Sequence, residues 1–145
     1  MTEKIEFEHL NADWNAEPNA PEVEIAIAGN DIVLRFFLNP FAYGRFHAGD
    51  RATLTFHDCL KYRCGAPNEE GFYVFGASRY KPFGVKWGEF YRVRGADWKS
   101  DFPDAVLVSE QPLDALSHYL FYVLDEAFEC VAKSYDLEFE TGIKN

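Results

Sequence analysis

The sequence predicts an all-β or β-dominated fold, an antiparallel sandwich or barrel of about eight strands, with an α+β fold as the alternative. Apolar and polar residues alternate with period 2 along most of the chain, which is typical of half-buried strands. Clusters of Gly, Pro, Asn and Asp separate the alternating runs and favour turns. The 145 residues include 14 Phe, 8 Tyr and 3 Trp, enough aromatic surface for the core of a single domain spanning residues 1–145.

The first strands are the clearest. Residues 4–8 alternate, and a loop follows that we expect Trp14 to anchor to the body of the domain. Residues 22–27 and 32–38 alternate again on either side of a Gly-Asn-Asp turn. Gly and Asn tolerate the positive φ angles of tight turns, so these two runs predict a β-hairpin.

The middle of the chain predicts one long strand over residues 51–64, ended by a Gly-Ala-Pro-Asn sequence. Shorter strands are expected over residues 72–75, 85–93 and 105–108. Loops rich in Gly, Pro and Ser join these strands.

The last third of the chain has two interpretations. Leucine, valine and alanine recur at helical spacing over residues 112–132, which fits one helix. The alternative is a hairpin whose first strand covers 118–124 and whose second strand returns from 128, with a bulge near Lys133, to about residue 140. We favour the hairpin because the run at residues 119–123 is rich in aromatic and β-branched residues.

Charge is unevenly distributed. Residues 1–34 hold eight acids and one lysine, residues 35–99 hold six acids and eleven bases, and residues 100–145 hold ten acids and two lysines, for a net charge of −10. Acidic ends and a basic middle can neutralise each other within one fold. The overall balance disfavours binding to nucleic acid or anionic membranes, and it suits a basic protein partner.

Targeting and membrane signals are missing. The N-terminal residues contain no apolar h-region, and no stretch approaches the roughly 20 apolar residues of a membrane span. The three cysteines are an odd number, which favours reduced thiols. We therefore expect a cytoplasmic protein that does not enter a membrane.

Standard catalytic and cofactor signatures are also missing, including the glycine-rich phosphate loops, the G-x-S-x-G elbow and C-x-x-C. His57 and Cys59 would share one face of a continuous strand, but a zinc site needs two further ligands, and Cys64 would face the other way. We predict no metal, no cofactor and no catalytic residue. Bases alternate with aromatics over residues 79–94, as in single-strand nucleic-acid binders, but the acidic flanks would repel a polyanion.

Two acidic groups are the candidate binding residues. Adjacent carboxylates at a turn can hold a cation or a basic side chain, and carboxylates beside a histidine can perform acid–base chemistry. Ordinary turn and edge-strand chemistry also explains both groups, and we favour that interpretation. In the predicted hairpin, His118 and Cys130 would be cross-strand neighbours on one face. The candidates are Asn68, Glu69, Glu70, His118, Asp125, Glu126 and Glu129.

Two segments resemble a family of small bacterial proteins of uncharacterised function. The first is the Gly-x-Pro-Asn-Glu-Glu stretch within residues 60–70, and the second is His-Tyr-x-x-Tyr…Asp-Glu-x-Phe-Glu-Cys-x-Ala within residues 117–132. The resemblance covers about 27 of the 145 residues, favours the hairpin and implies no activity. Bacterial immunity-type proteins are similar in size, acidity and strand content.

These observations lead to two hypotheses. The first is a non-catalytic protein-interaction module, such as an acidic inhibitor or immunity-type protein for a basic partner. The alternative is a small-ligand binder or enzyme with a pocket between its β-sheets, lined by some of the many aromatic residues. Long β edges also leave room for a homodimer.

Overall fold

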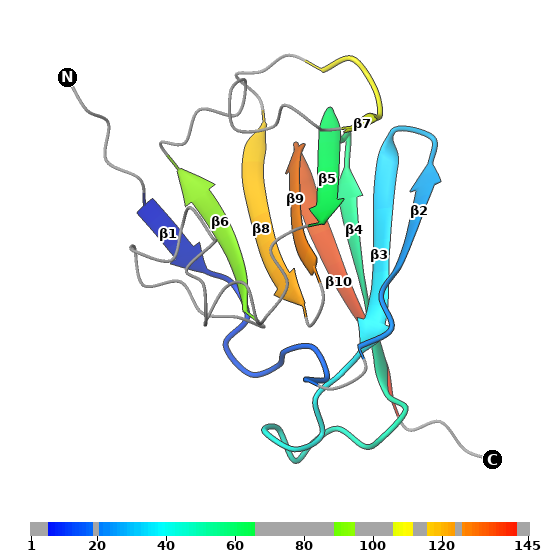
Figure 1. Cartoon of the computed structure of the whole chain (residues 1–145), viewed down its shortest axis with the longest axis vertical. Coiled ribbons are helices and arrows are strands. Elements are labelled where there is room, and N and C mark those ends of the chain that lie inside the picture. Colours follow the sequence, from blue (N-terminus) through cyan, green and yellow to red (C-terminus); the bar gives the residue numbers. More distant parts are fainter. Residues whose placement is uncertain are drawn as a thin grey trace.

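In the computed structural model, the described residues are 6–18, 21–65, 89–94, 106–111, 116–123 and 126–141. Within them the chain forms ten strands and no helix, in two antiparallel sheets that do not close into a barrel (Figure 1). The all-β sandwich prediction is confirmed. The described segments include no helix that could span a membrane. The predicted strand at 72–75 and the first part of the one at 85–93 lie outside the described residues.

The strands are β1 (Glu6–His9), β2 (Glu24–Ala28), β3 (Asp31–Phe37), β4 (Arg51–His57), β5 (Lys61–Gly65), β6 (Phe90–Arg94), β7 (Val106–Leu107), β8 (Ser117–Val123), β9 (Glu126–Ala132) and β10 (Ser134–Glu140).

The smaller sheet has four strands in the order β10-β4-β3-β2. The predicted hairpin is confirmed, because β2 and β3 pair antiparallel around a tight turn at Gly29-Asn30. Gly29 has φ 63°, a conformation that glycine adopts without the steric cost of a Cβ atom. In β3 and β4 burial alternates strictly, so one face of this sheet is apolar and packed while the other is partly exposed and mostly polar.

The larger sheet has six strands in the order β1-β6-β8-β9-β5-β7. Its central pair, β8 and β9, is the hairpin favoured over a helix for this part of the chain. The register pairs His118 with Val131 and Tyr119 with Cys130. Residues directly opposite each other share a face, so the prediction that His118 and Cys130 are neighbours on one face is wrong by one position.

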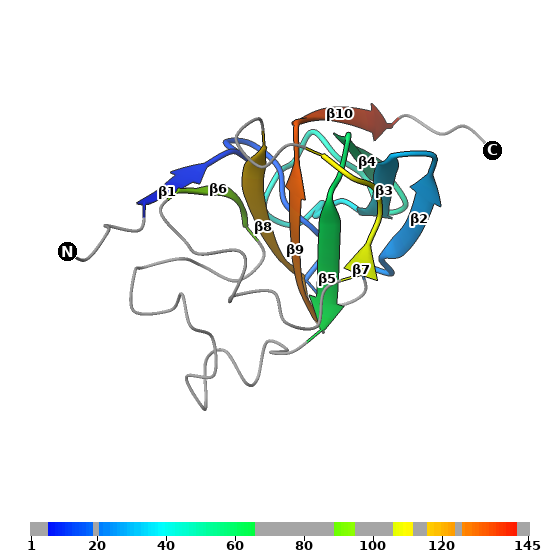
Figure 2. The same ribbon diagram turned by 90° about the horizontal axis from the view of Figure 1, so that it is seen from above.

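The two sheets are joined by a bent two-stranded ribbon. The predicted long strand at 51–64 is in fact two strands, because the chain leaves the smaller sheet after His57 and enters the larger one at Lys61. Asp58, with φ 48°, makes the break. The partner strand changes sheet at the same level, where Lys133 separates β9 from β10 (Figure 2). The bulge expected near Lys133 is therefore a corner between two sheets, a common device in β-sandwiches.

This corner also corrects the expected placement of two side chains. His57 stays on the outer, polar face of the smaller sheet with its side chain 34% exposed, whereas Cys59 is fully buried in the core. The two residues therefore do not share a face. In the described part of the chain, no group of three or more His, Cys, Asp or Glu side chains is arranged to hold a metal ion.

The core between the sheets is mainly aromatic. Trp14 is 3% exposed and stacks on Phe36 with ring centroids 5.8 Å apart, which confirms that it anchors its loop. Phe56 from the smaller sheet meets Tyr119 and Phe128 from the larger one at 5.3 and 5.5 Å. Such ring pairs contribute about 0.5–1.5 kcal/mol each beyond the surface they bury.

Candidate functional site

One predicted pair of site residues meets inside the larger sheet. His118 on β8 and Glu129 on β9 lie on the sheet face that points away from the sandwich core. His118 Nε2 donates to Glu129 Oε2 at 2.7 Å, and Arg63 on β5 lies 3.1 Å from Glu129 Oε1. The side chains of His118 and Glu129 are only 1% and 2% exposed. A dissolved substrate cannot reach them in this conformation, so the group is arranged as a buried ion-pair network that joins three neighbouring strands.

The remaining predicted site residues cannot be placed beside this pair. Asn68, Glu69, Glu70 and Asp125 lie outside the described residues, and of Glu126 only the backbone is described, at the start of β9. Of the proposed His118–Asp125–Glu129 cluster, the described residues include His118 and Glu129. Arg63, which sequence reasoning did not single out, lies beside Glu129.

Cys59 and Cys130 are not arranged as reactive thiols. Both are fully buried and form no disulfide. Burial raises the pKa of the Cys130 thiol well above its usual range, and the neighbouring Cys59 raises it further. A nucleophilic cysteine needs the opposite shift, toward the thiolate.

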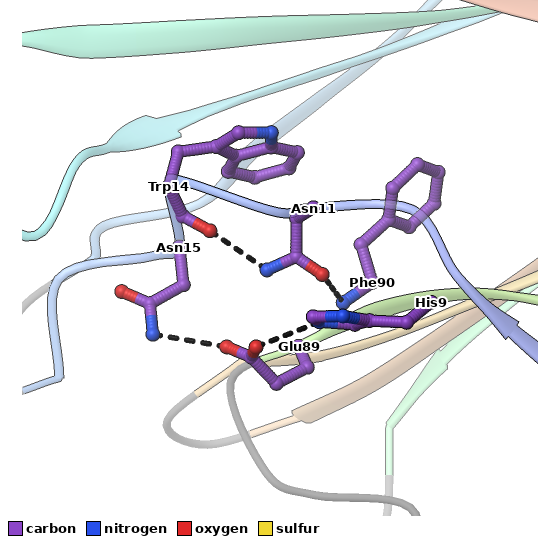
Figure 3. A network of polar contacts seen from close by, with 6 residues as sticks. All are labelled: His9, Asn11, Trp14, Asn15, Glu89 and Phe90. Atoms are coloured by element: carbon purple, nitrogen blue, oxygen red, sulfur yellow. Dashed lines mark hydrogen bonds and ion pairs between the residues drawn. The ribbon is translucent and has the colours of Figure 1, made fainter.

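A second polar network fixes the loop that carries Trp14 (Figure 3). Asn11 is fully buried, and its amide donates to the Trp14 carbonyl at 2.7 Å while its Oδ1 accepts from the Phe90 backbone N–H at 2.8 Å. Glu89 accepts from Asn15 Nδ2 at 3.0 Å and lies 2.8 Å from His9 Nε2. The network ties residues 9–15 to the start of β6.

Sequence reasoning missed this network because its partners are far apart in the chain. Glu89 lies 80 positions from His9 and 74 from Asn15. Neither pair has a spacing that any local motif would reveal. The group supports Trp14 in the core, and we interpret it as structural.

The outer face of the smaller sheet gathers charge from both ends of the chain. Every second side chain along β2, β3, β4 and β10 points outward, and the strand pairing places these outward side chains next to one another. One row runs Glu24–Arg35–Thr53–Glu138. Over these four strands the face holds five carboxylates and two guanidinium groups, namely Glu24, Asp31, Asp136, Glu138, Glu140, Arg35 and Arg51. We call this surface the acidic face.

Elsewhere the acidic ends neutralise the basic middle, as one interpretation of the sequence expected. Glu8 on β1 lies 3.0 Å from Arg92 and 3.2 Å from Arg94 on β6. Asp13 lies 3.3 Å from Arg45. These ion pairs balance charge locally, whereas the acidic face keeps more carboxylates than guanidinium groups.

His57 lies among the carboxylates of the acidic face. Its Nδ1 lies 3.2 Å from Asp31 Oδ2, and its Nε2 lies 2.6 Å from Asp136 Oδ2. Carboxylates accept hydrogen bonds, so both ring nitrogens donate only when the imidazole is protonated. The hydrogen bond to Asp136 is the main cause of a raised His57 pKa, and burial opposes it. The protonated ring joins β3, β4 and β10.

This geometry predicts a pH-dependent contribution to stability. A raised folded-state pKa stabilises the protein fully below the unfolded value of about 6.5, and the stabilisation disappears as the pH rises through the folded-state value. We therefore expect the difference in unfolding free energy between the wild type and His57→Asn to be larger near pH ~5.5 than near pH ~9. Urea titrations at both pH values measure it.

The variant Asp136→Asn is the control for this prediction, because it removes the principal hydrogen-bond acceptor of the ring. In this variant the NMR titration of the His57 ring should shift to lower pH. An unchanged titration would show that Asp136 does not hold the imidazolium.

A groove lies at the end of β3, beside the acidic face. It encloses about 260 Å³. Its apolar lining includes Phe37, Leu38, Pro40 and Phe41, and the carboxylate residues that line it are Glu17 and Glu22. Pockets for drug-sized ligands are usually about 300–1,000 Å³, so this groove fits one long side chain better than a whole cofactor.

Comparison with known proteins adds no relative. No family model, curated protein or solved structure matches this chain. The resemblance to small bacterial proteins therefore stays a prediction, and the function must be argued from the geometry alone.

Proposed function

We propose that this protein is a non-catalytic interaction module that binds a basic protein partner through the acidic face. The observation that carries the proposal is the meeting of the two acidic chain ends on one exposed sheet surface. Glu24 and Asp31 come from the N-terminal segment, and Asp136, Glu138 and Glu140 come from the C-terminal strand. An inhibitor or immunity-type role for a basic partner fits this arrangement.

Charge and exposure on this face support steering of a cationic partner. Glu138 and Glu24 are exposed, and they stand at opposite ends of the row that includes Arg35. Arg35 is itself held by Glu140, at 2.7 Å. Carboxylates at an interface rim act mainly by accelerating association, and their effect falls with salt because the Debye length shrinks from about 10 Å at 0.1 M to about 3 Å at 1 M.

The alternative of an enzyme or small-ligand binder has less support. Its candidate residues His118 and Glu129 are buried, and the described core between the sheets is filled with aromatic rings in contact with each other. A binding face on the surface needs neither a cavity between the sheets nor access to the buried pair.

The test of this proposal removes two charges from the acidic face. We expect Glu24→Gln combined with Glu138→Gln to reduce retention of captured partners by about tenfold at ~0.1 M salt, and much less at ~1 M salt. The measurement is affinity capture on the immobilised full chain from a lysate of the native cell, with quantitative mass spectrometry.

The matched control also removes two exposed glutamates. Glu6→Gln combined with Glu110→Gln makes the same charge change on β1 and after β7, at residues that do not belong to the acidic face. This control should retain partners as the wild type does. Equal loss in both double variants would contradict a specific face, and capture of nothing by the wild type would contradict the proposed function itself.

A further inference from the structure

The groove beside the acidic face is built from both apolar and acidic parts. Phe41 is 75% exposed, which leaves most of its ring open to contact by a partner. Phe37 lies at the end of β3, where its backbone N–H donates to the Pro21 carbonyl at 2.9 Å. That hydrogen bond holds the segment containing Glu22 against the end of the strand, so the carboxylate and the two rings line the same groove.

The groove continues the acidic face. Phe37 pairs with Arg51 across β3 and β4 on the outward side of the sheet, in line with Arg35 and Asp31 on the same strand. A partner that covers the acidic face would therefore reach the groove at its edge. Glu22 precedes β2 and is exposed, with φ 46°, an uncommon conformation for a residue other than glycine.

The chemistry of the lining selects among possible occupants. Among the described residues that line the groove, two carry carboxylates and none is basic, so a cationic group is favoured over an anionic one. The aromatic lining favours a planar cation with an apolar stem. The protein already shows this contact, because the Arg51 guanidinium lies 4.3 Å from the centre of the Phe37 ring. A guanidinium stacks on rings and binds carboxylates in a bidentate manner, which an ammonium does not.

We propose that the groove receives an arginine side chain of the basic partner. The stem would lie along Pro40 and Phe41, and the guanidinium would meet Glu22. This inference rests on the proposed function, because it names the side chain by which the partner is anchored at the edge of the acidic face. Arginine is also the basic residue most enriched among the residues that dominate binding energy at interfaces.

The test uses the full chain and a defined probe. The probe is a blocked peptide of glycines with a central arginine pair, and its citrulline counterpart has the same shape without the charge. Titration of the ¹⁵N-labelled protein is followed by NMR. We expect the arginine peptide to shift amide signals of residues 37–41 and 22, and the citrulline peptide to bind at least about fivefold more weakly.

Variants then separate the groove from the face. Glu22→Gln and Phe41→Ala should each weaken the arginine peptide by about threefold or more. Leu107→Ala, another exposed apolar side chain at 74%, should not. NMR spectra of the free variants verify that each is folded, which the exposure of Glu22 and Phe41 leads us to expect.

The outcomes distinguish the two proposals. The amide shifts could be centred on β4 and β10, be unaffected by Glu22→Gln, and become smaller with Glu24→Gln and Glu138→Gln. That result would overturn the groove proposal and leave the acidic-face proposal standing. Equal binding of the citrulline peptide would also overturn the groove proposal, since charge would not be recognised. Absence of any salt-sensitive binding of the arginine peptide would overturn both.

Discussion

Replacing Phe56 with alanine is expected to lower the free energy of unfolding by about 3–5 kcal/mol. Phe56 is fully buried near the end of β4. Its ring centroid lies 5.3–6.4 Å from those of Phe90, Tyr119, Phe128 and Tyr135. The truncation removes the transfer free energy of the ring and leaves a cavity whose neighbours are large, rigid rings that cannot collapse to fill it. Urea denaturation followed by tryptophan fluorescence measures the loss.

The same chemical change at Phe41 is the control. Phe41 is 75% exposed, so Phe41→Ala should change the unfolding free energy by less than about 0.5 kcal/mol. If the two variants were equally stable, Phe56 could not lie in the middle of the aromatic core, and the packing of the two sheets described here would be wrong.

Replacing Glu129 with glutamine is expected to cost about 3–5 kcal/mol. The carboxylate of Glu129 accepts from His118 Nε2 at 2.7 Å and lies 3.1 Å from Arg63. Glutamine carries no charge and has one acceptor oxygen in place of two, so the largely buried Arg63 guanidinium loses the charge of Glu129 and one of the two donors faces an NH₂ group where an oxygen accepted. Such a loss costs more than the intact pair contributes. Denaturation at pH ~7 compares the variant with the wild type.

Glu138→Gln serves as the matched control, because it makes the same substitution at an exposed position of β10. It should remain within about 0.5 kcal/mol of the wild type. A loss of less than about 1 kcal/mol for Glu129→Gln would mean that the network with Arg63 and His118 is solvated, contrary to its burial here.

The parts of the fold that the sequence predicted are those with a local cause. β3 is buried on one face only, so Ile32, Leu34 and Phe36 alternate with half-exposed residues that include Asp31 and Arg35, and this alternation reveals the strand. The turn at Gly29 was visible for the same local reason. In β8, by contrast, residues 118–122 are all buried, so both faces are covered and the period-2 signal is lost. That double burial is why a helix and a hairpin competed there.

The parts that the sequence did not predict depend on contacts between distant segments. No pattern marks His57 as the last residue of its sheet, because Asp58 leaves the sheet only where its partner strand turns at Lys133. The same distinction between local and distant contacts applies to the candidate site. The sequence could predict the His118–Glu129 pair because both residues lie in one hairpin. Arg63 and the two acidic chain ends needed the strand order, which the sequence left open.

The bent ribbon has a consequence for how the protein opens. The β4–β5 segment pairs with the β10–β9 segment, β4 with β10 in the smaller sheet and β5 with β9 in the larger one. Each of these two stretches of chain therefore contributes one strand to each sheet. At the corner, the Leu60 N–H donates to Val131 and the Lys133 N–H donates to His57, at 2.8 and 2.9 Å. The two paired segments cannot separate in one sheet without breaking the hydrogen bonds at the corner that also hold them together in the other sheet. Amide protons on both sides of the corner should therefore exchange with solvent through one shared opening, and the two layers should behave as a single cooperative unit.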